Sequence, residues 1–408
     1  MADCCGLLSA NRHYQPDFCY CHSVSGKDCI DLARVLYVCA CYPQARGVKW
    51  VSSFRDSGFD VVVFRGRALK GGEETWARDS TSILIQSVGP LSGKFPVSLA
   101  LARRIARLAA SHKPDLVLVR DIFLAWYAFH AAKSLNIPCY VDIADNYPEV
   151  VDTIVSFAPG AQLGFHLLNG WERYVLVHAH GIVTVSQESK ARIMKKHGLP
   201  DSKIFVVENA PRNAVAYAAR GREFAGNLVY IGTYDHGIRD LDTVVKGMRE
   251  YCELSGGRIH LTIYAFEQER VRSMLRGLGD FAELVTVVPA VPNSMLHEAL
   301  RRYDAGIVPH CRCPATEYTV PNKLYDYLYS GIPVICSDSP PLKRVLDDVG
   351  GGVIYSAGDP LSFSQSVLRL REMIDKGQGR VDTDGLISRY SWSVQVEPFI
   401  RNLHGTLT

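Results

Sequence analysis

Lys323 and Asp326 are the residues of this chain whose types and spacing are best suited to chemistry. Pro321 suits a first helical position and Gly331 a helix end, so the sequence predicts a short helix between them. Asn322, Lys323 and Asp326 would share one flank of that helix. Lysine and helix amides neutralise phosphate, whereas carboxylates accept hydrogen bonds from hydroxyl groups. The segment therefore predicts a site for an anionic, hydroxyl-rich ligand such as a nucleotide sugar.

The composition is that of an ordinary globular protein of 408 residues, 47% hydrophobic and 21% charged. A formal charge of +3 is too small for this size to indicate a nucleic-acid partner. No apolar run approaches the roughly 20 residues that cross a bilayer, and the first thirty residues do not resemble a secretory signal. We therefore expect a cytoplasmic protein, with peripheral contact at the inner face of the membrane as an open question.

Short apolar β-branched runs alternate with helical stretches from Ala33 onward, which predicts parallel sheets covered by helices on both faces. The pattern lapses after Pro211 and restarts at Asn227, so we expect an α/β protein with two doubly wound Rossmann-like domains. The predicted parts are a cysteine-rich extension (1–32), a first domain (33–211), a linker (212–226), a second domain (227–390) and a helix packing near the domain joint (391–408). Ligands of such sheets bind at the carboxyl ends of the strands, so both domains should contribute to one cleft.

Cysteines are frequent in the extension, where Cys19, Cys21, His22 and Cys29 could form a zinc or redox site. Their spacing matches no common zinc pattern, so a loosely ordered extension is the favoured interpretation.

Residues 317–335 resemble the C-terminal signature of the retaining GT-B glycosyltransferases of family four, in which two acidic residues separated by seven precede a Gly-x-Pro-Val-Ile strand. Aligned on Gly331, the second acidic position falls on Asp326 and the first on Tyr318, one residue after Glu317. Residues 141–149 are similar to the acidic loop of these enzymes, and residues 180–186 and 203–211 look like the end of their N-terminal domain.

The resemblance implies a GT-B fold, with an acceptor-side first domain and a nucleotide-sugar-binding second domain facing a central cleft. It implies a glycosyltransferase that retains anomeric configuration, moving a sugar from a nucleotide diphosphate donor to a glycan or lipid-linked acceptor in polysaccharide synthesis. Asp145 and Glu317 would be catalytic, Asp145 near the acceptor and reacting carbon and Glu317 at the donor-sugar hydroxyls. Lys323 would bind the diphosphate, Asp326 the ribose, and Asn322 would lie beside them.

The diphosphate site departs from the family pattern, which places an arginine after the glycine of the first C-domain strand and a lysine before a following glycine. Here Thr233, after Gly232, stands where the family has the arginine, and His236, before Gly237, stands where it has the lysine. We expect Gly232, His236 and Arg239 to contact the donor, with Arg239 compensating for the missing pair. Cationic groups and helix amides can stabilise a departing diphosphate without metal, and the chain has no convincing Asp-x-Asp motif. We therefore expect no metal and no cofactor.

Four further residues are expected on the acceptor side or in its loops: Gly47, Arg120, Asp121 and Glu149. Each also has a structural interpretation, as a turn glycine, a strand-end pair or a helix cap. An exposed ion pair is the corresponding alternative for Lys323 and Asp326.

Arginines at positions 103, 104 and 107 could form a basic surface for anionic lipid, although a solvated helix face is the simpler interpretation. Two other functions stay open: a nucleotide-sugar epimerase on the same fold, and a degenerate scaffold without catalysis. Fold alone does not separate them.

Overall fold

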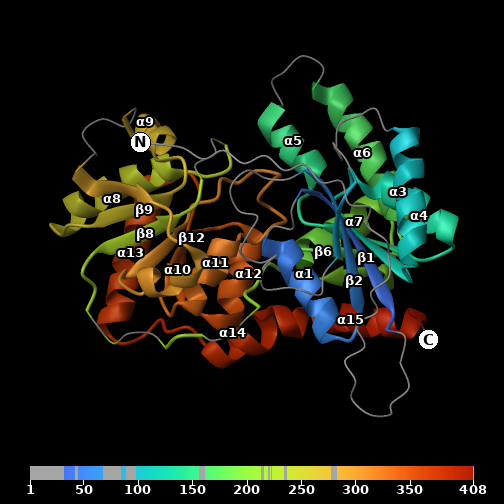
Figure 1. The fold of residues 1–408 in the computed structure, drawn as a ribbon. Coiled ribbons are helices and arrows are strands. Elements are labelled where there is room, and N and C mark those ends of the chain that lie inside the picture. Colours follow the sequence, from blue (N-terminus) through green and yellow to red (C-terminus); the bar gives the residue numbers. More distant parts are fainter. Residues whose placement is uncertain are drawn as a thin grey trace, which may run out of the picture. The chain divides into compact units, whose positions relative to one another are not determined.

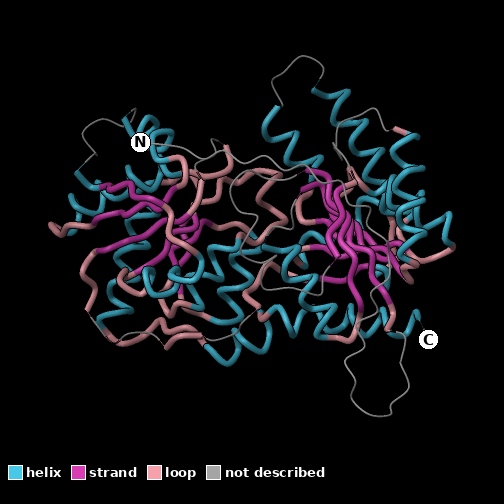
Figure 2. The backbone as a smooth tube through the Cα atoms, in the orientation of Figure 1, coloured by secondary structure: helices cyan, strands magenta, loops and turns pink. Residues whose placement is uncertain are grey.

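The computed structural model describes residues 32–41, 45–67, 84–88, 98–155, 161–212, 216–218, 221, 223–233, 237–276 and 283–407. Within this part, Figures 1 and 2 show two separate parallel sheets, each flanked by helices. Residues 1–31 of the predicted cysteine-rich extension lie outside the described residues.

The first sheet has seven described strands in the order β3-β2-β1-β4-β5-β6-β7. They are β1 (Arg34–Cys41), β2 (Asp60–Arg67), β3 (Leu84–Ser87), β4 (Leu116–Arg120), β5 (Cys139–Ile143), β6 (Gly181–Thr184) and β7 (Ile204–Val206). The helices between them are α1 (Ala45–Asp56), α3 (Leu99–His112), α4 (Ala125–Leu135), α5 (Tyr147–Val155), α6 (Ala161–His178) and α7 (Gln187–His197), with a 3-10 turn at Asp201–Lys203.

Both faces of this sheet are buried because successive side chains of a strand point to opposite sides. In β1, Leu36 and Val38 belong to a core with α3, α4 and α6, whereas Val35 and Tyr37 belong to a core with α1. This two-sided burial explains why the strands are continuous apolar runs rather than alternating ones.

The second sheet has six described strands in the order β10-β9-β8-β11-β12-β13. They are β8 (Asn227–Ile231), β9 (His260–Ala265), β10 (Val285–Pro289), β11 (Ala305–Val308), β12 (Val334–Ser337) and β13 (Gly352–Tyr355). The helices are α8 (Leu241–Ser255), α9 (Gln268–Leu275), α10 (Asn293–Leu300), α11 (Asn322–Tyr329), α12 (Pro340–Val349), α13 (Pro360–Asp375) and α14 (Thr383–Tyr390).

Both sheets follow the doubly wound order in which the first strand lies at the centre and the chain reverses direction across it. In the second sheet, β8 pairs with β9 on one side and β11 on the other. The crevice at such a reversal, outside the carboxyl ends of the strands, is the usual ligand position. The predicted α/β architecture of two Rossmann-like domains is thus confirmed.

The last helix, α15 (Trp392–Leu407), packs on the first sheet although it follows the second in sequence. Trp392 is fully buried, with its ring 5.1 Å from that of Trp50 and its Nε1 donating to Ser53 Oγ at 2.8 Å. Phe399 lies 5.4 Å from Trp50 as well. The chain therefore crosses between the sheets twice, after β7 and again before α15.

The helix predicted between Pro321 and Gly331 is α11. It begins at Asn322, with Pro321 as the extended residue before it rather than the first helical one. Gly331 follows the end with φ of 71°, a conformation that glycine adopts without strain. None of the described helices is long and apolar enough to cross a membrane.

Candidate active site

A cavity of about 510 Å³ lies at the carboxyl ends of the strands and is lined from both sheets. The first sheet contributes Asp145, which follows β5, together with Ala144, Val185 and Asn209. The second contributes the loops after β8, β9 and β10 and the start of α11. Among the lining residues, the charged ones are two cations, Arg239 and Lys323, and two carboxylates, Asp145 and Asp326.

Lys323 is held at the cavity wall by its neighbours. Its side chain is only 9% exposed, and its Nζ lies 3.9 Å from the centre of the Tyr230 ring. A cation over an aromatic face in a partly dehydrated place is favourable. The amine is thereby fixed beside the end of β8, where an anionic group could meet it.

The position of α11 depends on two glycines. Tyr327 lies flat against β11, where a side chain on Gly306 would come within 2.3 Å of the ring, and its hydroxyl accepts from the Ile231 amide at 2.9 Å. Gly232 has φ of 126°, and a Cβ there would lie 2.9 Å from Lys323 Nζ. Glycine at both places lets the helix and the lysine approach the sheet closely.

Arg239 supplies the second cation, from the loop between β8 and α8. Residues 239 and 310 form an antiparallel bridge, so this loop is held along the end of β11. His310 itself is 1% exposed, and neither ring nitrogen has a partner within the described part of the chain. Burial, with the nearby Arg239 and Lys323, holds the pKa of His310 well below its usual range, so the imidazole is neutral.

Asp326 faces Lys49 across the joint between the two sheets. Burial raises the pKa of Asp326 to about 6, and the charges of Lys49 and Lys323 partly offset that shift. Lys49 donates to the carbonyl oxygens of Ala210 at 2.7 Å and Asn209 at 3.1 Å. Burial and the neighbouring Arg46 lower the pKa of Lys49 to about 8. No ion pair joins Lys323 and Asp326 among the described contacts.

Asp145 is exposed to the cavity, yet the surrounding protein raises its pKa by removing water from the carboxylate. Arg120, Arg46 and Arg239 oppose this shift. Arg120 and Asp121 lie behind Asp145, 3.8 Å apart, and burial raises the pKa of Asp121 to about 6. The loop after β5 therefore brings a carboxylate to the cavity within the field of three arginines.

A buried cluster positions this wall. Arg46 donates to both oxygens of Asp142, the nearest at 2.6 Å, and to the Val207 carbonyl oxygen at 2.8 Å. Trp50 Nε1 donates to Asp142 at 2.8 Å. Because every strong donor and acceptor here is matched, Arg46 and Asp142 brace the carboxyl ends of β5 and β7 rather than face a ligand.

Glu149 and Gly47 lie outside the cavity lining. Glu149, in the first turn of α5, accepts from Arg192 and from Lys196, the latter at 2.9 Å. It ties α5 to α7 and so supports the loop that carries Asp145. Gly47, expected in a glycine loop, is buried in the first turn of α1 because the helix already begins at Ala45.

Glu317 is also absent from the cavity lining. Arg312 donates to the Glu317 carboxylate at 2.5 Å. The carbonyl oxygen of the next residue, Tyr318, accepts from Ser186 Oγ at 2.5 Å. Asn322 does line the cavity, beside Lys323. His236 lies outside the described residues.

Sequence reasoning missed three residues at this site: Lys49, His310 and Phe266. Lys49 is far from Asp326 in the chain, and only the joint between the sheets brings the two close. Phe266 is 84% exposed at the cavity wall, directly after β9. Its position directly after a predicted strand is the sequence signal that could have placed Phe266 at the site, because ligands bind at the carboxyl ends of the strands.

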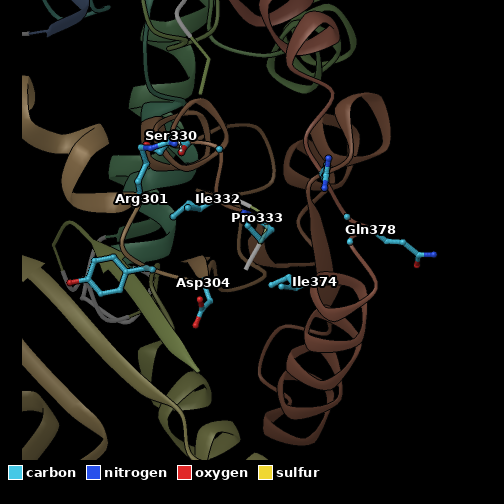
Figure 3. A pocket seen from close by; sticks show the side chains of 13 residues that line it. Arg301, Asp304, Ser330, Ile332, Pro333, Ile374 and Gln378 are labelled. Atoms are coloured by element: carbon cyan, nitrogen blue, oxygen red, sulfur yellow. Dashed lines mark hydrogen bonds between the residues drawn. The ribbon is translucent and has the colours of Figure 1, made fainter. Parts of the chain in front are cut away.

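A second cavity lies at the opposite, amino ends of β11 and β12 (Figure 3). Its volume of about 60 Å³ holds no more than a few water molecules. Asp304 in its wall accepts from the amides of Ala225 and Asn227, and Arg301 donates to the Ser330 carbonyl oxygen. These groups fix loops, so the cavity that is lined from both sheets is the candidate active site.

Two doubly wound domains that share a cleft at their strand ends define the GT-B glycosyltransferase architecture. Solved structures with this fold include the sucrose-phosphate synthase of Thermosynechococcus elongatus, with a TM-score of 0.67 at 12% identity over 91% of this chain and 99% of that one. HepE of Anabaena, solved with UDP and glucose, gives 0.62 at 11% over 91% and 100%. The lipopolysaccharide outer core galactosyltransferase WaaB gives 0.60 at 17% over 92% and 99%.

Two family descriptions match the sequence in succession. Residues 49–210 match Glycosyltransferase Family 4, and residues 225–373 match Glycosyl transferases group 1. The chain is therefore a glycosyltransferase with a Family 4 domain followed by a group 1 domain, as the resemblance of residues 317–335 predicted. No curated protein matches the sequence.

Proposed function

We propose that the protein transfers a sugar from a nucleoside diphosphate donor to a hydroxyl of a glycan or lipid-linked acceptor, with retention of configuration and without metal. The observation that carries this proposal is the cavity at the strand ends, with Lys323 and Arg239 on its second-domain wall and Asp145 on its first-domain wall. The cations would stabilise the negative charge of a diphosphate, and the polar group opposite them would stabilise the reacting sugar.

The donor would lie with its diphosphate between Lys323 and Arg239. The Gly232 backbone leaves room for close approach there, as its φ of 126° and its missing side chain allow. Asp326 would accept hydrogen bonds from the ribose while ionised. Phe266 offers an aromatic face at the rim of the same cavity, suited to stacking on a base.

In the reaction, the bond between the anomeric carbon and the phosphate oxygen breaks, and its electron pair leaves with the diphosphate. The acceptor oxygen bonds to the same face of that carbon, and its proton passes to an oxygen of the departing diphosphate. Lys323 and Arg239 would stabilise the charge that develops on the leaving group. Asp145 would orient the acceptor hydroxyl and stabilise the cationic sugar across the cleft.

A thermal-shift panel of UDP-, GDP-, TDP- and ADP-sugars tests the donor class, because a ligand that binds only the folded protein raises Tm. With the stabilising donor, nucleoside diphosphate should be released only when an acceptor is present, and EDTA should leave the rate unchanged. Conversion of the donor sugar without nucleotide release would instead identify an epimerase. Stabilisation by none of the four would contradict both enzymatic functions and favour a scaffold.

A further inference from the structure

Three helices, α3, α4 and α6, lie side by side on one face of the first sheet, which α7 also covers (Figure 1). The buried sides of α3 and α4 are lined by alanines and pack on each other and on the strands. Tyr174 of α6 lies 6.4 Å from Phe129 of α4, ring centre to ring centre. The outward sides of the three helices thus form one continuous surface, here called the outer helical face.

The charge on the outer helical face has a single sign. It carries five exposed cations, which are Arg103, Arg104, Arg107, Lys133 and Arg173. The three helices contain one carboxylate, Glu172, and it is 1% exposed and bound by Arg192 at 2.8 Å. The outer helical face therefore presents no exposed carboxylate from these helices.

Apolar side chains are exposed between the cations. Leu163 and Leu167 of α6 are 65% and 66% exposed, and Leu99 at the start of α3 is 47% exposed. Tyr174 and Val177 extend the same line along α6, at spacings of a single helix stripe. These residues are not needed by the core, because Val175 and Leu176 already fill it from the other side of α6.

We propose that the outer helical face is a docking surface for a bilayer that contains anionic lipids. Long basic side chains reach the headgroups, and the leucines enter the boundary between headgroups and acyl chains. Acidic exposed groups, which would oppose this contact, are missing from all three helices. The single sign of charge spread over three helices, with apolar residues between, fits a flat anionic surface.

The position of the apolar residues connects this surface to the cavity. α3 and α6 run antiparallel to the strands, so Leu99, Leu163 and Leu167 near their starts lie at the carboxyl end of the sheet, which also carries Asp145. A lipid-linked acceptor held in the bilayer would present its sugar at that end. This consequence depends on the proposed function, whereas docking itself does not.

Co-sedimentation with vesicles tests the surface without any substrate. One set of vesicles is phosphatidylcholine alone, and in the other about one lipid in three is phosphatidylglycerol. Each basic residue near an anionic surface strengthens binding roughly fivefold. The variant Arg103→Gln, Arg104→Gln, Arg107→Gln should therefore bind anionic vesicles about a hundredfold more weakly. Leu163→Gln with Leu167→Gln should weaken binding about tenfold or more.

Matched controls lie on or directly after the helices of the second sheet. Lys246→Gln, Arg276→Gln and Lys343→Gln remove the same charge from exposed positions elsewhere, and Leu254→Gln changes a leucine that is 57% exposed on α8. These variants should bind as the unaltered protein does. Equal losses in the controls, or equal binding to neutral and anionic vesicles, would overturn the proposal.

Two other outcomes would also overturn it. No binding to either vesicle would exclude bilayer docking, whatever the transferase activity. A dimer in sedimentation velocity that dissociates in Leu163→Gln with Leu167→Gln, without vesicle binding, would show that a second copy covers the face. Nucleotide release with a water-soluble acceptor reports the proposed reaction separately from vesicle binding.

Discussion

Replacement of Lys323 by methionine should weaken binding of the nucleoside diphosphate about 10- to 150-fold. Methionine keeps most of the side-chain volume and removes the charge. A hydrogen bond to a charged group contributes about 1.5–3 kcal/mol, which corresponds to that range of Kd. The cavity lining holds two cations and two carboxylates, so the variant leaves Arg239 as the lining cation against Asp145 and Asp326. The buried setting of Lys323, at 9% exposure, limits replacement of its charge by water.

The assay is isothermal titration with whichever of UDP, GDP, TDP or ADP gives the largest thermal shift. The corresponding nucleoside, which lacks phosphate, should bind both proteins equally. Lys246→Met, at an exposed position on α8, is the matched control and should change nothing. A nucleoside diphosphate Kd within twofold of the unaltered value, in a folded Lys323→Met protein, would refute the phosphate role of this lysine.

Three further predictions concern the same cleft and its support. Because burial raises the pKa of Asp326 to about 6, its charge is lost as pH falls through 6. The nucleoside diphosphate should therefore bind about tenfold more weakly at pH 5 than at pH 7, and Asp326→Asn should reduce that difference. Gly232→Ala places a side chain at φ of 126°, against Lys323 Nζ; urea unfolding should show a loss of about 1–3 kcal/mol and donor KM should rise, whereas unchanged values would show that the loop adapts. Trp392→Ala should lower the free energy of unfolding by about 3–5 kcal/mol, and an unchanged urea midpoint would mean that α15 does not support the first sheet.

Much of the fold could be predicted because its signals are local. The apolar runs from Arg34 onward predict strands that are buried on both faces, and the restart at Asn227 predicts a second sheet. The segment from Pro321 to Gly331 predicts α11 because a helix start and a helix end both depend on the residues at those positions. Lys323 and Asp326 could be placed on one flank of α11 for the same reason.

The remaining parts of the site depend on contacts between distant residues. Nothing near Lys49 in the sequence indicates that it lies close to Asp326, since the joint between the sheets decides this. In the sequence, His310 is simply a residue that follows a strand. Only its burial beside Arg239 and Lys323, which the fold creates, connects it to the site. Glu317 lies one residue from the family's first acidic position, and its bond to Arg312 depends on how the loop folds.

The return of α15 to the first sheet affects how the protein is made. On the ribosome, the strands from β1 to β7 emerge before any residue of α15 exists, so the apolar face that Trp392, Phe399 and Leu403 cover stays open during synthesis of the whole second domain. Domains of many proteins fold one after another as they emerge. Here the first domain cannot complete its fold until α15, the last helix, has been synthesised. A nascent chain released early, or a gene fragment ending near residue 390, would expose that face and become a client of chaperones rather than a working half.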